Sequence, residues 1–242
     1  MQSLTNMSFK TIVKKQVKWK AKLYSSALSS LIILQVIFGA LLFSSGSASS
    51  GHGRGNLNVQ FSIYSLDMFL IISALWAFII AILFTTKSYR IDDLSIISSR
   101  TSSAIANILV LILYSFIAVL IMLASYYIQI FGLSLMEKDS LIIDKLIITP
   151  SIFIVCISSI CLFGAIGLLF GYCFQGPSII KISSIVLLAI VIISPIIFPD
   201  FVNLQPFIQL PDLLLSGFYV IVSILCFTLC IWIADKSEVS RK

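Results

Sequence analysis

The sequence predicts an all-α, polytopic membrane protein with six transmembrane helices. Of its 242 residues, 59% are hydrophobic and only 11% are charged, against roughly a quarter charged in ordinary soluble domains. The mean hydropathy is +1.10, and six long runs carry no Asp, Glu, Lys, Arg or His. A soluble fold of this length could not bury so much apolar surface. The composition therefore excludes a soluble globular domain, a disordered protein and a nucleic-acid-binding protein.

The first expected element is an interfacial amphipathic helix over residues 8–23. Its apolar side chains recur at near-helical spacing, and a separate row of lysines follows an i, i+4 spacing, which is typical of a helix lying on anionic lipid. The apolar residues are Phe9, Ile12, Val13, Val17 and Trp19. The lysines are Lys10, Lys14, Lys18 and Lys22. A simple topology anchor is an equal alternative.

The six spans follow from the charge-free runs, because a transmembrane helix needs about 20 mostly apolar residues. Long unbroken runs favour helices over a β-barrel, whose strands alternate polar and apolar residues. The third run is long enough to tilt, and Lys181 can snorkel at the start of the short fifth run. We expect one transmembrane domain over residues 1–242 with spans at about 24–44, 68–86, 104–131, 150–173, 182–198 and 213–234.

The start of the chain also resembles a secretory signal peptide. Lysines precede the first apolar run, and the small residues 44–49 follow it. The apolar run is longer than a typical signal sequence, and the basic stretch before it is extended. We therefore favour a first span that is retained over one that is cleaved.

Basic residues divide unevenly between the two sides of this arrangement. If the N-terminus is inside, 13 of the 16 Lys and Arg residues fall in the N-terminal segment, the inner loops and the C-terminal tail. Only Arg54, Lys138 and Lys145 then lie outside. Cytoplasmic segments of membrane proteins carry such an excess. We expect a multi-pass protein of the cell membrane with both termini and residues 87–103 in the cytoplasm.

The sequence carries no pattern typical of catalysis, metal binding or nucleotide binding. The spans contain no Asp, Glu or His for a proton relay or a catalytic base, and no Gly-rich phosphate-binding loop with a Lys is present. The five cysteines lie in predicted spans and are interpreted as packing residues, and the single His52 lies in an outer Gly/Ser-rich loop. These features leave a passive channel, a scaffold, or the membrane half of a machine powered by another subunit.

The longest inner loop between spans, 87–103, mixes both charge signs with apolar residues. Together with the basic N-terminal helix and six spans with both ends inside, it resembles the ABC-2 type permeases of ATP-binding-cassette exporters. The resemblance implies a cytoplasmic coupling helix between spans two and three that contacts the ATPase; a solvated loop is the plain alternative. The residues expected in this contact are Arg90, Ile91, Asp92, Asp93, Leu94, Ile97 and Arg100.

Two later segments are also similar to this family. The fourth span has a face of small residues, although GxxxG spacing serves ordinary helix packing as well. These small residues are Gly164, Gly167 and Gly171. Residues 199–212 are interrupted by three prolines, which break a continuous helix, but are too apolar for a free loop. The resemblance implies short re-entrant half-helices in the outer leaflet before the sixth span.

The function implied by the resemblance is that of a permease subunit. Two such chains, or one with a related permease, would form the pathway, and two copies of a separate ATPase would bind ATP and Mg²⁺ and drive it. We expect this chain to be no enzyme and to bind no cofactor. By analogy with small permeases of the family, the substrate would be a peptide, an antimicrobial or a lipid-like compound, exported from a bacterium for secretion or self-immunity. The alternative is a non-transporting immunity or sensor scaffold, or a small channel.

Overall fold

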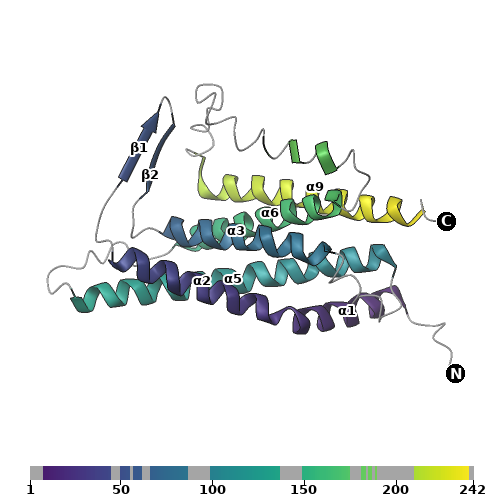
Figure 1. The fold of residues 1–242 in the computed structure, drawn as a ribbon, viewed down its shortest axis with the longest axis horizontal. Coiled ribbons are helices and arrows are strands. Elements are labelled where there is room, and N and C mark those ends of the chain that lie inside the picture. The colour runs from purple at the N-terminus through teal and green to yellow at the C-terminus, as the bar shows by residue number, and fades with distance from the viewer. Residues whose placement is uncertain are drawn as a thin grey trace.

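The computed structural model of the chain is a bundle of long helices with one short hairpin (Figure 1). The helices run side by side along the long axis of the molecule, and the hairpin stands off one end of the bundle. The residues that the structure describes are 8–44, 50–54, 57–61, 66–86, 99–136, 149–174, 181–183, 185–186, 189 and 210–239.

Helices α1 (Phe9–Leu23) and α2 (Ser25–Ser44) form a bent pair with an angle of 42° between them. Ser8, in an extended conformation, begins α1 as its N-cap. The regular helix ends at its C-cap Tyr24, whose φ of −95° and ψ of 11° depart from helical values, although its N–H still donates to the Lys20 carbonyl at 2.9 Å. The predicted helix over 8–23 is therefore present, but it continues into α2 at a moderate bend.

The remaining long helices are α3 (Leu66–Thr85), α5 (Arg100–Met136), α6 (Pro150–Phe174) and α9 (Asp212–Val239). Their starts carry typical signals. Pro150 begins α6, where its missing N–H costs nothing, and Asp212 gives α9 an acidic first turn that suits the helix dipole. The Ser99 hydroxyl caps α5 by accepting from the Ser102 N–H at 3.2 Å.

Four of the described helices are long and apolar enough to cross a membrane, and the bent α1–α2 pair would make a fifth. Their bounds agree with the predicted second, third, fourth and sixth spans, although α5 begins four residues before its predicted span and runs on to Met136. With 37 residues, α5 is about 55 Å long and exceeds the roughly 30 Å of the hydrocarbon core. Most of the predicted fifth span, 182–198, and most of the segment 199–212 lie outside the described residues.

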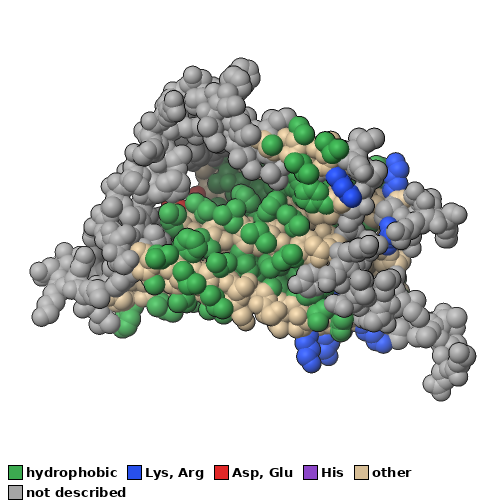
Figure 2. Space-filling model, in the orientation of Figure 1, with side chains coloured by type: hydrophobic (Ala, Val, Ile, Leu, Met, Phe, Trp, Pro, Cys, Tyr) green, Lys and Arg blue, Asp and Glu red, His purple; other side chains and the backbone are tan. Residues whose placement is uncertain are grey.

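Helix α6 lies at the centre of the bundle and contacts α3, α5 and α9, whereas α1 and α2 pack mainly against α5. The core is apolar and includes Phe69, Leu111, Met122, Ile160 and Leu168. Many large hydrophobic side chains on α2, α5 and α9 are exposed instead, and they cover much of the face seen in Figure 2. Such an apolar surface is compatible with a multi-pass membrane protein.

Strands β1 (Ser50–Arg54) and β2 (Leu57–Phe61) form an antiparallel hairpin in which Ser50 pairs with Phe61 and Arg54 with Leu57. The Gly/Ser-rich composition predicted a loop here, and this prediction was wrong. The Gly/Ser composition of the first strand concealed the alternation of apolar residues in the second, where Leu57, Val59 and Phe61 are two residues apart. The fold is thus helical apart from this hairpin in its described part.

Candidate functional site

Polar side chains, most of them buried, gather where α1 and α2 face α5 and α3. They form a line along the bundle that we call the polar seam, made of Gln16, Lys20, Gln35, Ser73, Ser102, Ser103, Asn107, Ser125 and Gln129. The seam lies inside an otherwise apolar protein, where a polar group without a partner costs free energy. Each hydrogen bond of the seam therefore constrains how the bent α1–α2 pair sits on the bundle.

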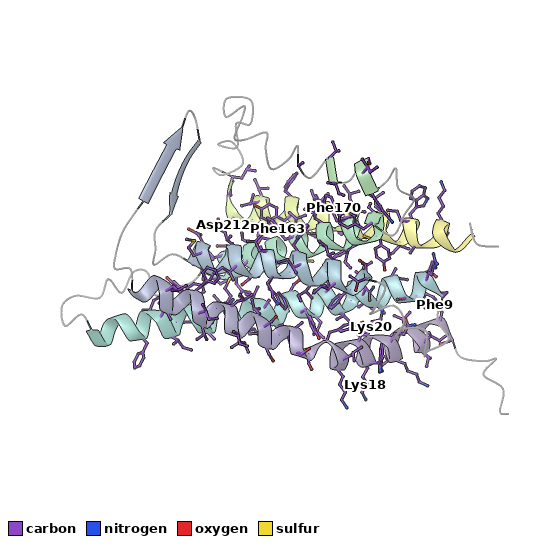
Figure 3. All side chains as sticks on the ribbon, viewed as in Figure 1. Phe9, Lys18, Lys20, Phe163, Phe170 and Asp212 are labelled. Atoms are coloured by element: carbon purple, nitrogen blue, oxygen red, sulfur yellow. The ribbon has the colours of Figure 1, made fainter. Side chains whose placement is uncertain are left out.

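Lys20 anchors the seam at one end. Its side chain is 0% exposed, and its Nζ donates to Asn107 Oδ1 at 2.6 Å and to Ser103 Oγ at 2.9 Å. Asn107 in turn donates from Nδ2 to the Tyr172 hydroxyl at 3.3 Å. Figure 3 shows Lys20 pointing from α1 into the bundle while Lys18 points away from it. The Lys20 side chain thus joins α1 to α5 and, through Asn107, to α6.

Two further contacts hold α1 on α5. Gln16 Nε2 donates to Ser102 Oγ at 3.5 Å, and the Tyr114 hydroxyl donates to the Ala21 carbonyl at 3.0 Å. The Gln16 Oε1 atom is buried and has no hydrogen-bond partner among the described residues. Sequence reasoning missed this anchoring because it grouped Lys20 with the other lysines of the segment. The available signal was the spacing of Val13, Gln16 and Lys20, which are three and four residues apart and therefore share one helix face away from the row of exposed lysines.

The end of the bundle at Lys20 is the basic end. The exposed lysines of α1, Arg100 at the start of α5 and Lys236 near the end of α9 all belong to it, and Figure 2 shows the Lys and Arg side chains gathered there. Lys236 Nζ lies 5.1 Å from the centre of the Trp232 ring, a cation–π distance. Arg54 is in the hairpin at the opposite end.

Gln35 forms the middle of the seam. Its side chain is 1% exposed, its Nε2 donates to Ser73 Oγ at 2.9 Å, and its Oε1 accepts from the Ser125 hydroxyl at 2.8 Å. The Ser73 hydroxyl in turn donates a hydrogen bond to the Phe69 carbonyl at 2.8 Å. One amide thereby joins α2 to both α3 and α5.

A groove of about 360 Å³ lies beside Gln35, between α2, α3 and α5. Its walls are mostly apolar, with Gln35, Ser125 and Gln129 as the polar exceptions. Gln129 is 8% exposed, and its Nε2 has no hydrogen-bond partner among the described residues. The groove was not predicted from the sequence, because glutamine and serine are uncharged and do not interrupt an apolar run.

The three glycines of α6 lie at close helix contacts. A Cβ at Gly167 would meet the Phe78 carbonyl oxygen on α3 and would lie 3.0 Å from Ala81 Cβ. A Cβ at Gly171 would meet the Thr85 side chain, also on α3. A Cβ at Gly164 would lie 2.9 Å from both Leu111 Cδ atoms on α5. These glycines let the backbone of α6 approach its neighbours, as small residues do in membrane bundles.

The residues expected to contact an ATPase fall largely outside the described part of the chain, which omits 87–98. Arg100 is described and is the half-buried first residue of α5. On α1, Val13 is buried and Phe9 is exposed, whereas Ile12, Val17 and Trp19 are half-buried. The helix therefore packs one side, Val13, Gln16 and Lys20, against the bundle.

Within the described residues no group of three or more His, Cys, Asp or Glu side chains could hold a metal ion. The five cysteines are free thiols, and Cys156, Cys226 and Cys230 are buried. The polar groups of the site are amides, hydroxyls and the buried amine of Lys20. Comparisons with models of known protein families, with curated proteins and with solved structures find no match for this chain.

Proposed function

We propose that this chain is the permease subunit of an ATP-binding-cassette exporter in a bacterial cell membrane. Two copies, or one copy with a related permease, would enclose the pathway. Two copies of a separate ATPase would bind ATP and Mg²⁺ and supply the work. The substrate would be a peptide, an antimicrobial or another amphipathic compound.

The attachment of α1 to the first turns of α5 carries this proposal. Gln16 and Lys20 bond to Ser102, Ser103 and Asn107, which lie within about two turns of the start of α5 at Arg100. The connection 87–99, where an ATPase would push, leads directly into those turns. A displacement of this connection would move α1 together with α5, and α1 continues into α2. A subunit driven from outside the membrane requires a link of this kind.

The gathering of basic residues at one end of the bundle supports the proposed orientation. Cytoplasmic segments are enriched in Lys and Arg, so the basic end would face the cytoplasm and the hairpin would face outward. A cysteine at Ser50, in the hairpin, should react with a membrane-impermeant thiol reagent in intact cells. One at Ser99, before α5, should react only after the cells are opened. Labelling of Ser99→Cys from outside would refute the orientation.

Purification of the tagged chain from its native membranes in mild detergent tests the partner. An ATPase with a phosphate-binding P-loop and the cassette signature should co-purify in a fixed ratio, and only the complex should hydrolyse ATP. Leu94→Asp should abolish this association at unchanged expression, because a charge would be buried at the contact. Arg90→Ala is the matched milder change, since exposed charges contribute little.

Other outcomes would favour the alternatives. ATP hydrolysis by the purified chain alone would refute the assignment as a passive subunit. Selective ion currents from the chain alone in planar bilayers would indicate a small channel. Normal ATPase binding and intact export with Leu94→Asp would show that 87–103 is a solvated connection. Absence of an ATPase from the complex would leave a non-transporting immunity or sensor scaffold that binds a toxin or a kinase.

A further inference from the structure

We propose that the groove between α2, α3 and α5 binds an acyl lipid of the surrounding bilayer, whose ester carbonyl accepts a hydrogen bond from the Gln129 amide. The groove is formed by this chain alone. The inference therefore does not depend on an ATPase or on transport, and its failure would leave the permease proposal standing. Four observations support it.

The first is the state of Gln129. Its amide is more than nine-tenths buried and lines the groove, yet Nε2 finds no acceptor among the described residues. Buried polar groups in folded proteins almost always have a partner, and an exception calls for a ligand, an ion or a water. In a bilayer the lipid itself supplies an acceptor, the ester carbonyl at the boundary between the headgroups and the hydrocarbon core.

The second is the contrast with Gln35 on the opposite wall. Gln35 donates to Ser73 and accepts from Ser125, so both ends of its amide are used within the protein. Ser125 and Gln129 are four residues apart on α5 and therefore share a helix face. The Gln35 amide fixes the spacing of α2 and α5, and the Gln129 amide next to it is left to bind something else.

The third is the shape of the groove. Gly39, Ala40 and Gly132 lie along it, and the Phe69 ring is buried beside them. A Cβ at Gly39 would lie 3.8 Å from Phe69 Cζ, an ordinary contact distance, so the glycine is not required by packing there. Small residues leave space beside the amides, and the apolar walls suit a hydrocarbon chain.

The fourth is the place of the groove on the molecule. Val36 and Ile128 at its rim are 62% and 71% exposed, so it opens on an apolar outer face. Gly39 lies about 21 Å along α2 from its start at Ser25, roughly two thirds of the helix. A lipid entering from the leaflet on the hairpin side would place its carbonyl near Gln129 and its chain towards the middle of the bilayer.

Photolabelling of the full chain in nanodiscs tests the proposal. The probes are two phosphatidylglycerols with a diazirine in one chain, one with ester-linked acyl chains and one with ether-linked alkyl chains that lack the carbonyl. In the wild type the ester probe should label peptides of α2 and α5 around the groove at least about fivefold more than the ether probe. Equal labelling by both probes would overturn the proposal.

Two variants and one control define the site. Gln129→Leu removes the donor and should abolish the preference for the ester probe, while Ala40→Phe fills the groove and should reduce labelling by both probes. Leu225→Phe, on the exposed face of α9, should change neither. Unchanged labelling in Gln129→Leu and Ala40→Phe would refute the site. Labelling by a photoreactive acylated peptide, with none by the lipid, would overturn the assignment to a bilayer lipid.

Discussion

Two contacts in the same bundle are built on opposite principles. At the contact between α3 and α6, Gly167 and Gly171 bring the two backbones so close that a single methyl group would collide with α3. At the contact between α2 and its neighbours α3 and α5, Gln35 bridges the helices by hydrogen bonds, a groove remains open, and large side chains such as Val36 stay exposed. The first contact favours one rigid arrangement. The second has a specific register but leaves room for a ligand or for movement.

This difference divides the protein into a packed half, formed by α6 and the helices packed on it, and an adaptable half, formed by α1 and α2. Helix α6 contacts α3, α5 and α9 extensively, whereas α1 and α2 depend on α5 and on the polar seam. Close packing of small residues gives stability to membrane bundles in the absence of a hydrophobic driving force between helices. Interhelical hydrogen bonds in such bundles contribute modestly to stability, about 0.6 kcal/mol on average. They therefore determine the position of a helix more than they stabilise the bundle. The following substitutions test the division, in order of decreasing effect.

Gly167→Ala should be the most destabilising change. The new Cβ would meet the Phe78 carbonyl oxygen, which belongs to a helix backbone and cannot turn aside. Overpacking of this kind costs typically 1–3 kcal/mol, and we expect about 3 kcal/mol, seen as a fall in the unfolding temperature in detergent. Gly217→Ala is the matched control, because nothing lies within 4 Å of that Cβ. It should gain up to about 1 kcal/mol from helix propensity. Equal effects at both positions would contradict the close contact.

Asn107→Leu should have the next largest effect. It removes the acceptor that lies 2.6 Å from the buried Lys20 Nζ and the donor to Tyr172. Hydrogen bonds to charged groups are worth about 1.5–3 kcal/mol, so we expect a loss of about 2 kcal/mol and greater protease sensitivity of α1. Lys22→Met is the matched control. It replaces a lysine on the exposed side of α1 and should be neutral. A neutral Asn107→Leu would show that α1 is held by its other contacts alone.

How much of this could be predicted from sequence differs between the two halves. The helices of the packed half follow from apolar runs, and Gly167 and Gly171 were already visible as a small-residue face. The adaptable half was not visible, because hydropathy treats Gln35 and Gln129 as mild interruptions and Lys20 as one lysine among six. Whether a polar residue of α1 or α2 faces a partner or lipid depends on the rotation of that helix, which tertiary packing decides. The hairpin was hidden by its glycines.

Gln35→Leu should be moderately destabilising. Leucine fits an apolar interface, but the Ser125 hydroxyl loses its acceptor and Ser73 Oγ loses its donor. We expect about 1 kcal/mol, in line with hydrogen bonds between membrane helices. The Gln35–Ser125 hydrogen bond sets the distance between α2 and α5. A pair of cysteines introduced at Val36 and Ile128 should therefore form a cross-link in lower yield in this variant. Unchanged stability and unchanged cross-linking would show that Gln35 does not position α2.

Gln129→Leu should have the smallest effect on stability and the opposite sign. The amide Nε2 is buried without a partner in the described part of the protein, so its removal takes away a desolvation cost that no bond offsets. In lipid-free detergent we expect the variant to be as stable as the wild type or more stable by up to about 1 kcal/mol. Added ester-linked phosphatidylglycerol should raise the unfolding temperature of the wild type and reduce the difference, because a ligand that binds only the folded state stabilises it. Gln35→Leu, by contrast, should still respond to the lipid. A large loss of stability in Gln129→Leu would show that this amide is a structural member of the seam, and the contrast between the two glutamines would no longer hold.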